Sequence, residues 1–536
     1  MRRALLLVPA LLLLSTASPA HAAAVKFTPC LKAKDFDCAK VRVPLDYDKP
    51  SGAQLKIAVS RLPAKDRKHK LGSIFINYGG PCCGAIYGTQ QFGAGLFAPL
   101  RKRFDLIAFD PRGTGYSRPL LRGCDVNEVR QGVFRVPFTT PATFSAQSEL
   151  RKADYYAHRC ERRNRRLAAH MGTGNVARDI DHIRARMGLE RIDYFGFSYG
   201  TQLGATYAAL FGDHLRSAVL DGALNPTEYI NAPVDTVLEQ SKGFEDALDR
   251  YFAGCKRKRS ECRWSRGGPP ERVYDRLVKR ADASPLPLRK RGRTPGKRRV
   301  DGDLINLATI GGLYSKFGWP GISAGLDEIR FKGTAQLVRA GADSAFGRQD
   351  DGSFTPYNDR FYMISAGEQV YPEDPQIYFD NGARVFNQLP HFYSNTGYTD
   401  LNWARYRPLD ADRFDGPFKL PGSTPAPLVI GTTHDPATPY VDAEAMAKQL
   451  GHARLLTMEG DGHTAFGGNS ACIDRAVVRY MTTLKLPARG KKCRQQVPFK
   501  RPPDAEASAA GGASSVTRGT PPAPLTAPFT ALTPKG

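Results

Sequence analysis

The apolar residues in the first part of the chain predict strands that alternate with helices. Short apolar runs that end in glycine and proline, typical of strands leading into loops, occur at 72–81 (GSIFINYGGP) and 103–115 (RFDLIAFDPRGTG). Residues 175–190 instead repeat apolar positions at helical spacing and reach a stop signal at Gly188.

The alternation continues and is then interrupted. We expect a strand at 191–198, a helix at 199–212 and a strand at 215–226. After Pro226 the pattern changes to helical, aromatic-rich segments with basic insertions, and a strand followed by a helix returns only near residue 426. The sequence therefore predicts an α/β fold, with a mostly parallel sheet flanked by helices and a large, mainly helical cap inserted into it.

The two ends of the chain do not resemble the globular part. A basic start, an apolar stretch to about Leu14 and the small residues Ala20 and Ala22 predict a cleaved secretory signal, and the apolar run is shorter than the roughly 20 residues of a membrane span. The Pro-, Ala-, Gly-, Ser- and Thr-rich end predicts a disordered tail. The predicted segments are the signal (1–22), the first part of the core (23–225), the cap (226–420), the second part of the core (421–500) and the tail (501–536). We therefore expect an extracellular protein without a membrane span.

Export makes the ten cysteines informative, because thiols tend to pair in an oxidising compartment. Proximity along the chain suggests four disulfides: Cys30 with Cys38, Cys124 with Cys160, Cys255 with Cys262, and Cys472 with Cys493. The adjacent Cys82 and Cys83 are left over, and they could form a vicinal disulfide or stay as thiols. No cysteine pair in the chain has the two-residue spacing of a zinc site together with a matching histidine pair, and we expect no metal.

The formal charge of +25 is concentrated, with about half of the excess between Lys256 and Arg299. A basic surface can attract anionic polymers, so we expect at most a weak association of this cap segment with the cell wall. We find no aromatic-interleaved basic motif of a nucleic-acid-binding fold, and we expect no nucleic-acid partner.

Ser198 lies in the pattern G-x-S-x-G, between a predicted strand and a predicted helix. A sharp strand-to-helix turn brings the backbone two residues before and after it close to its neighbours, and only glycine, here Gly196 and Gly200, leaves enough room. The turn then projects the serine hydroxyl above the sheet, which makes Ser198 the candidate nucleophile.

A serine hydroxyl needs a base, and in this architecture the base follows it in sequence. His463 lies in a glycine-flanked loop (458–468) after an apolar run, where an imidazole can reach over the sheet. His391 and His452 are expected to be packing or surface residues, and His434 adjoins the best candidate for the acid.

That acid is Asp435, where an apolar strand ends in a loop closed by prolines. Asp221 also ends a strand and is the rival, although we expect it to cap the loop that follows it. Asp110 is expected to be structural, with Arg112 as its partner.

Two backbone N–H groups are expected to stabilise the oxyanion. Tyr199, directly after the nucleophile, supplies one, and Gly80 in the loop 77–85 (NYGGPCCGA) supplies the other. This chemistry requires no cofactor.

As a set, these motifs resemble the secreted actinobacterial tripeptidyl aminopeptidase group of the α/β-hydrolases, which is related to prolyl aminopeptidases. The similarity runs from about Cys30 to Cys493, through motifs such as 109–117 (FDPRGTGYS), 195–211 (FGFSYGTQLGATYAALF) and 460–481 (GDGHTAFGGNSACIDRAVVRYM), and it weakens across the cap. It implies an α/β-hydrolase fold and serine exopeptidase chemistry on peptide substrates, under a helical cap that restricts access to peptide N-termini.

The chain departs from that family in two places. The family loop usually continues GGPGGSG, whereas here Cys82 and Cys83 follow Pro81. In the cap, the cysteine of a common Cys-x-Asp stretch falls at Ala366 and the acid at Glu368. Glu368 is our candidate for binding the substrate's ammonium group. Glu373 and Asp374 are the next candidates for this role.

We therefore expect acyl transfer through Ser198, His463 and Asp435. Two alternatives remain open. The same serine motif serves esterases, so the substrate could be an ester or another acyl compound. The cysteine pair and the basic insertion also leave room for an exported binding protein that has lost catalysis.

Overall fold

The computed structural model describes residues 24–125, 145–288, 299–349, 352–392 and 400–500. The predicted signal, the predicted tail and residues 289–298 of the basic segment lie outside this part of the chain.

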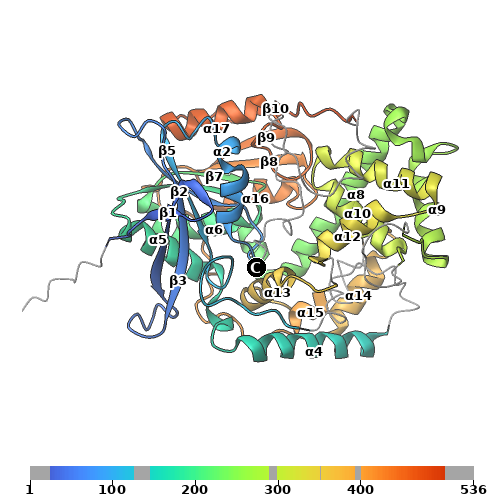
Figure 1. Ribbon diagram of the computed structural model, residues 1–536, viewed down its shortest axis with the longest axis horizontal. Coiled ribbons are helices and arrows are strands. Elements are labelled where there is room, and N and C mark those ends of the chain that lie inside the picture. Colours follow the sequence, from blue (N-terminus) through green and yellow to red (C-terminus); the bar gives the residue numbers. More distant parts are fainter. Residues whose placement is uncertain (1–23, 126–144, 289–298, 350–351, 393–399, 501–536) are drawn as a thin grey trace, which may run out of the picture.

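The centre of the molecule is a ten-stranded sheet with the strand order β1-β2-β3-β5-β4-β6-β7-β8-β9-β10 (Figure 1). All neighbours from β5 to β10 are parallel, whereas β1, β2, β3 and β5 pair antiparallel. The strands are β1 (Thr28–Cys30), β2 (Ala33–Pro44), β3 (Gln54–Leu62), β4 (Gly72–Asn77), β5 (Phe104–Asp110), β6 (Ile192–Phe197), β7 (Leu215–Asp221), β8 (Leu428–His434), β9 (Arg454–Asp461) and β10 (Lys492–Arg494). The mostly parallel sheet expected from the sequence is confirmed, with an antiparallel edge in addition.

Helices cover both faces of the sheet. One apolar cluster joins the sheet to α5 (Thr173–Arg186), α6 (Tyr199–Phe211) and α16 (Tyr440–Gln449). A second cluster joins the other face to α1 (Ala85–Gly88) and α17 (Ala471–Thr483). The shorter or peripheral helices are η1 (Thr89–Gly93), α2 (Ala94–Leu96), α4 (Ala146–Asn164), η2 (Ala168–His170) and η3 (Gly212–His214). The apolar alternation in the sequence thus buries the strands on both faces.

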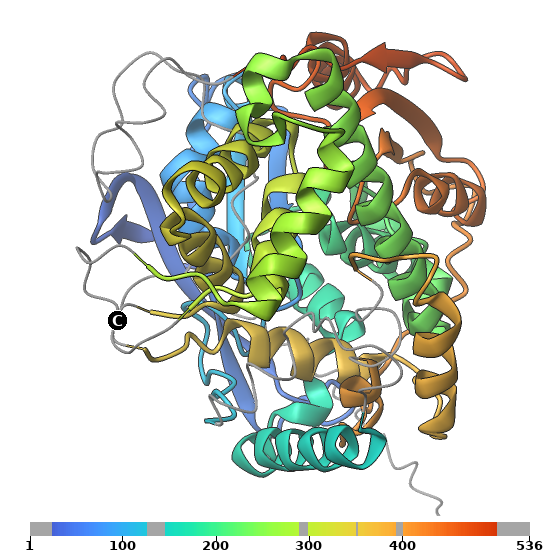
Figure 2. The ribbon, with the colours of Figure 1, turned by 90° about the vertical axis from the view of Figure 1, so that its right-hand side faces the viewer.

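Between β7 and β8 the chain forms helices. They are α7 (Pro226–Asn231), α8 (Pro233–Arg257), η4 (Arg259–Ser265), α9 (Pro270–Ala283), α10 (Gly302–Leu313), η5 (Lys316–Gly318), α11 (Trp319–Lys332), α12 (Gln336–Phe346), α13 (Tyr357–Glu368), α14 (Gln376–Val385) and α15 (Asp400–Ala404). The group α8–α12 has a core of its own and stands beside the sheet, on the right of Figure 1 and facing the viewer in Figure 2. Within the described ranges, no helix is both long and apolar enough to cross a membrane.

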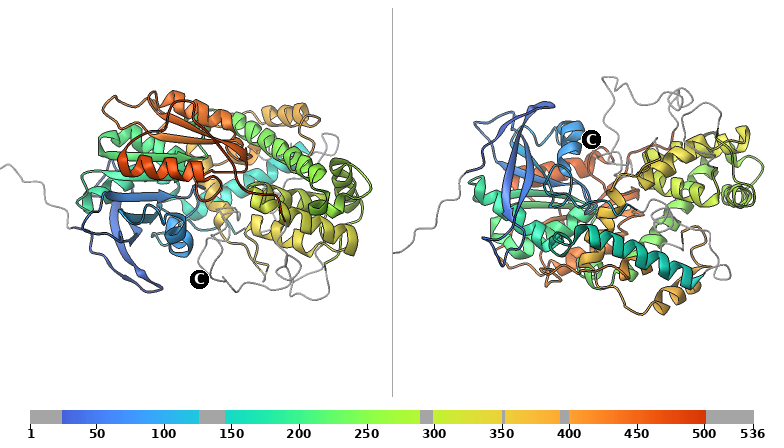
Figure 3. Two further views of the ribbon diagram at one scale, coloured as in Figure 1. Left: turned by 90° about the horizontal axis from the view of Figure 1, so that it is seen from above. Right: turned by 60° about the horizontal axis from the view of Figure 1, so that its bottom comes forward.

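Helix α13 belongs to the packing of the core. Tyr362, Met363 and Ile364 on this helix join the apolar cluster of the sheet domain. Helix α4 runs along the same side of the molecule, next to α15 (Figures 1 and 3). The helices between β7 and β8 therefore meet the core through α13 as well as through the group α8–α12.

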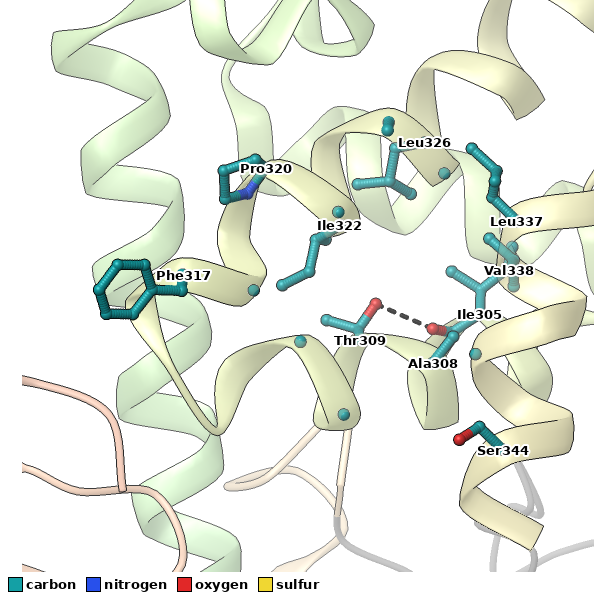
Figure 4. Close-up of a pocket in the computed structure, with 17 residues that line it drawn as sticks. Ile305, Ala308, Thr309, Phe317, Pro320, Ile322, Leu326, Leu337, Val338 and Ser344 are labelled. Atoms are coloured by element: carbon teal, nitrogen blue, oxygen red, sulfur yellow. Dashed lines mark hydrogen bonds between the residues drawn. The ribbon is translucent and has the colours of Figure 1, made fainter. Parts of the chain in front are cut away.

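An apolar pocket of about 540 Å³ lies between α10, α11 and α12. Figure 4 shows Ile322 and Leu326 from α11 facing Ile305 and Thr309 from α10, and the Thr309 hydroxyl donates to the Ile305 carbonyl. None of the candidate catalytic residues lines this pocket.

The four disulfides expected from proximity along the chain all form: Cys30–Cys38, Cys124–Cys160, Cys255–Cys262 and Cys472–Cys493. Cys82 and Cys83 are free thiols.

Candidate active site

Ser198 lies at the junction of β6 and α6, with φ 55° and ψ −129°. A positive φ is strained for a residue with a side chain, and such strain is concentrated at functional sites. Local hydrogen bonds hold the conformation: the Ser198 N–H donates to the Asp221 carbonyl at 2.9 Å, and the Ser198 carbonyl accepts from the Thr201 N–H at 2.8 Å.

The glycines on either side of Ser198 are required by close approach. A Cβ at Gly196 would lie 2.2 Å from the Gly200 carbonyl oxygen, and a Cβ at Gly200 would lie 2.7 Å from the carbonyl oxygen of Asn77. The crowding argued from the sequence is therefore present at both positions.

His463 and Asp435 form a buried pair. The His463 Nδ1 lies 3.0 Å from each carboxylate oxygen of Asp435, and the side chains are 3% and 0% exposed. The Asp435 carboxylate also accepts the N–H groups of Ala437 and Thr438, each at 2.9 Å. These donors hold the carboxylate in the orientation that selects the tautomer with the proton on Nδ1.

The other imidazole nitrogen of His463 is available. Nε2 is buried, and the described residues provide no hydrogen-bond partner for it, so the structure contains no Ser198–His463 hydrogen bond. With the proton on Nδ1, Nε2 is an acceptor that can take a proton.

Asp221 connects Ser198 with the His463 loop. Its carbonyl accepts the Ser198 N–H, and its buried carboxylate accepts the Ala465 and Phe466 N–H groups at 3.0 and 2.8 Å. Burial raises the pKa of Asp221 to about 7, against the lowering effect of these N–H groups. The expectation that Asp221 caps its own following loop is wrong, because its carboxylate serves a loop 244 residues away.

The next residue, Gly222, also lies against the imidazole. A Cβ at Gly222 would be 3.0 Å from the His463 Cε1. The segment Asp221–Gly222 therefore contacts both Ser198 and His463.

The cap helices contact the His463 loop in a way that the sequence did not suggest. The His463 N–H donates to the Tyr314 carbonyl at 2.7 Å, and the two rings meet edge to face with centroids 5.7 Å apart. Asp461 binds Arg250 and Lys316, each at 2.7 Å. Burial raises the pKa of Asp461, but the hydrogen bonds from these two cations outweigh it and keep the pKa below its usual value.

The loop expected to stabilise the oxyanion approaches Ser198. A Cβ at Gly79 would lie 2.7 Å from the Ser198 Cβ and 3.2 Å from the Tyr199 nitrogen. Tyr199 is the first residue of α6, so its N–H has no acceptor within the helix. No acceptor for the Gly80 N–H is present among the described residues, whereas the Gly79 N–H donates to the Asn77 side chain.

Glu368 is buried behind Tyr199 and Tyr229. Its carboxylate accepts the Thr173 N–H at 2.7 Å and the Tyr229 hydroxyl at 3.3 Å. No cationic side chain of the described residues pairs with it, and burial raises its pKa to about 7. The two further candidates for binding the ammonium group are not buried in this way. Glu373 is 87% exposed and pairs with Arg407, and Asp374 accepts the Gln376 N–H.

The three other histidines considered as candidates for the base have partners elsewhere. His391 binds Glu245 and Asp275, whose hydrogen bonds outweigh burial and raise its pKa to about 9. His434 binds Asp246, and the His452 Nε2 donates to a backbone carbonyl, that of Thr424.

The expected pairing of Asp110 with Arg112 is wrong. Asp110 instead accepts the N–H groups of Ile86 and Tyr116. Arg112 forms a buried pair with Asp179 at 2.7 Å, which is a structural ion pair between the loop after β5 and α5.

Comparison with known proteins supports the same family. A family model described as alpha/beta hydrolase fold matches residues 73–469. The chain is 32% identical over 495 residues to the serine protease Hip1 of Mycobacterium tuberculosis, across 89% of this chain and 92% of that protein. It is 33% identical over 464 residues to carboxylesterase B of the same species, across 85% and 86%. It is 27% identical over 477 residues to tripeptidyl aminopeptidase of Streptomyces lividans, across 86% and 84%.

The chain therefore belongs to the α/β-hydrolase family. Among its relatives are proteins named as serine peptidases and as a carboxylesterase, and it is a serine hydrolase.

Proposed function

We propose that this protein is a secreted serine exopeptidase that cleaves peptides near their free N-terminus. The observation that carries the proposal is the buried Asp435–His463 pair. Its Nε2 has no partner among the described residues, and the His463 loop is hydrogen-bonded through Asp221 to the strained Ser198. The relatives named serine protease and tripeptidyl aminopeptidase favour a peptide substrate over other acyl compounds.

Catalysis proceeds by acyl transfer. The His463 Nε2 removes the proton of the Ser198 hydroxyl as the oxygen attacks the peptide carbonyl. Asp435 stabilises the imidazolium that forms. His463 then protonates the leaving amine, and water repeats the sequence on the acyl-enzyme to release the N-terminal fragment.

The N–H groups of Gly80 and Tyr199 stabilise the oxyanion. The described residues offer these two N–H groups no competing acceptor. This supports the role, because pre-oriented donors stabilise developing charge without reorganisation.

Glu368 binds the ammonium group of the substrate. When this buried carboxylate is ionised, no cation among the described residues compensates its charge, and a substrate ammonium would do so. Thr173 links Glu368 to Tyr199, the residue after Ser198, because its N–H donates to Glu368 and its hydroxyl hydrogen-bonds with the Tyr199 hydroxyl at 2.6 Å.

Secretion follows from the predicted signal at 1–22. The weak association of the basic cap segment with anionic cell-wall polymers stays a prediction.

The test is a comparison of three substrates on the purified enzyme: a tripeptidyl p-nitroanilide with a free amine, the same compound with a blocked amine, and a short-chain p-nitrophenyl ester. We expect kcat/KM for the free-amine peptide to exceed that for the blocked peptide by at least about tenfold, which corresponds to one charge-assisted contact. Equal rates on the two peptides would contradict an exopeptidase.

An esterase is the second candidate, favoured by the relative named carboxylesterase B. Rapid ester turnover with no hydrolysis of either peptide would establish it.

A further inference from the structure

Cys82 and Cys83 lie in a tight turn that begins at Gly80. The Cys83 N–H donates to the Gly80 carbonyl at 3.2 Å, which closes a β-turn over Gly80–Cys83. The two sulfur atoms are 2.7 Å apart, roughly 0.7 Å more than an S–S bond. A small movement would therefore allow them to bond.

The sulfur atoms pack directly on the proposed oxyanion donor. A Cβ at Gly80 would lie 3.0 Å from the Cys83 sulfur, 3.4 Å from the Cys82 sulfur and 3.6 Å from the Tyr357 hydroxyl. Tyr357 begins α13, and its hydroxyl lies beside Gly80 together with the two sulfur atoms. The thiols, Gly80 and the cap helix thus form one packed unit.

The two thiols differ in accessibility. Cys82 is 3% exposed, whereas Cys83 is partly exposed and can meet a small reagent. Burial raises the pKa of the Cys82 thiol, so this group is protonated near neutral pH and Cys83 is the thiol that reacts first.

We propose that Cys82 and Cys83 are a reversible redox site for low-molecular-weight disulfides such as oxidised glutathione, and that their oxidation slows hydrolysis by moving Gly80. The second half rests on the oxyanion role of Gly80 in the proposed function.

The chemistry balances as thiol–disulfide exchange. The Cys83 thiolate attacks one sulfur of the disulfide RSSR, forming a mixed disulfide and releasing RS⁻, which takes up the proton that Cys83 had lost. Cys82 then loses its proton and attacks the Cys83 sulfur, displacing the second RS⁻. The net result is one Cys82–Cys83 disulfide and two RSH, and two electrons from a dithiol reverse it.

The geometry explains why a Cys82–Cys83 disulfide would be easily reduced and why its formation would move Gly80. Consecutive Cα atoms are about 3.8 Å apart, closer than the usual 4.4–6.8 Å of disulfides, and such strain makes a bond more reducible. The other four disulfides span Cα distances of 4.4 to 5.6 Å. Closing the ring distorts the peptide between Cys82 and Cys83, which is part of the turn that holds Gly80.

The experiment incubates the purified full-length enzyme in glutathione mixtures from fully reduced to fully oxidised. Mass spectrometry of the peptide containing residues 82 and 83 measures the loss of two hydrogens, and hydrolysis of the best substrate is measured in parallel. We expect kcat to fall at least about tenfold with the same dependence on the glutathione ratio as the mass change, and dithiothreitol to restore it.

The matched control is the double variant Cys82→Ser with Cys83→Ser, which keeps the four other disulfides. It should hydrolyse at the rate of the reduced enzyme in every mixture, and the single variant Cys83→Ser should also be unresponsive. A pair that stays reduced in fully oxidised glutathione, or an oxidised pair with unchanged kcat, would overturn the inference. In the second case the exopeptidase proposal would stand, because the enzyme would still cleave its peptide.

Discussion

The cap helices reach the candidate site at two places that are built from different groups. At the His463 loop, the contact consists of the Tyr314 carbonyl and the paired charges of Asp461, Arg250 and Lys316. At the other side of Ser198, α13 brings Tyr357 to two free thiols and ends at the buried Glu368.

The contacts at the His463 loop therefore hold one conformation, whereas the groups at α13 can change their chemical state. The groups around His463 have satisfied partners, which suits a base whose position must not vary. The groups around α13 are a thiol pair, which can be oxidised, and a carboxylate whose pKa of about 7 lets it change protonation near neutral pH. We infer that the base side sets the chemistry, while the α13 side tunes oxyanion stabilisation and substrate choice.

The largest effect is expected from the base side. Asp435→Asn should lower kcat about 10⁴-fold, because an amide neither stabilises the imidazolium nor selects the right tautomer. Steady-state kinetics measures this. Asp246→Asn is the matched control, since Asp246 also pairs with a histidine, His434. Equal losses in both variants would mean that Asp435 has no special role.

On the oxyanion side, Gly79→Ala should lower kcat by about 10²- to 10³-fold, the size of a lost oxyanion donor. The added Cβ would lie 2.6 Å from the Phe197 carbonyl oxygen and must push the loop away from Tyr199. Gly188→Ala provides the control, because Gly188 also has a positive φ, 66°, but no atom within 4 Å of its Cβ position. Steady-state kinetics measures the loss, and circular dichroism checks that both variants are folded. Full activity in Gly79→Ala would contradict the role of this loop in oxyanion stabilisation.

Glu368→Gln should raise KM for free-amine peptides about 10- to 100-fold and leave blocked substrates unaffected, since a charge-assisted contact contributes about 1.5–3 kcal/mol. Glu328→Gln is the control. Glu328 is likewise buried and accepts one hydroxyl, from Thr334, and one N–H, from Leu337.

The pH dependence of KM also tests whether Glu368 binds the substrate ammonium. A carboxylate with a pKa raised to about 7 is protonated below that pH, so KM for free-amine peptides should rise as the pH falls from 8 to 6. This rise should disappear in Glu368→Gln. An identical pH profile in the variant would assign the effect to another group.

The smallest effect is expected where the cap helices hold the His463 loop. Asp461→Asn removes a carboxylate shared by Arg250 and Lys316, which are 36% and 20% exposed, so solvent moderates the loss. We expect kcat to fall about three- to tenfold. Asp343→Asn removes a carboxylate of α12 that is shared by Arg339 and Arg348, and it should leave kcat unchanged. A full rate in Asp461→Asn would show that these ion pairs do not position the base.

The sequence predicts features whose cause is local. The alternation at 191–226 predicts β6, α6 and β7, because buried strands and amphipathic helices leave distinct patterns. The four disulfides follow from proximity along the chain. The crowding at Gly196 and Gly200 follows from the turn that their motif describes.

Features made by distant segments could not be predicted in this way. The carboxylate of Asp221 serves a loop 244 residues away, and Arg112 pairs with Asp179 rather than with the nearby Asp110. The contact between Tyr314 and His463 depends on how the helices between β7 and β8 pack on the core, and the periodicity of one helix carries no information about its partner.

The central claim is that Ser198 is a nucleophile activated by His463. Its most direct test is labelling with a fluorophosphonate, followed by mass spectrometry of the peptides. We predict a single adduct on Ser198 in the unmodified enzyme and at least about 10³-fold slower labelling in His463→Ala. An adduct on a different serine, or an active enzyme that the probe does not label at Ser198, would contradict the account.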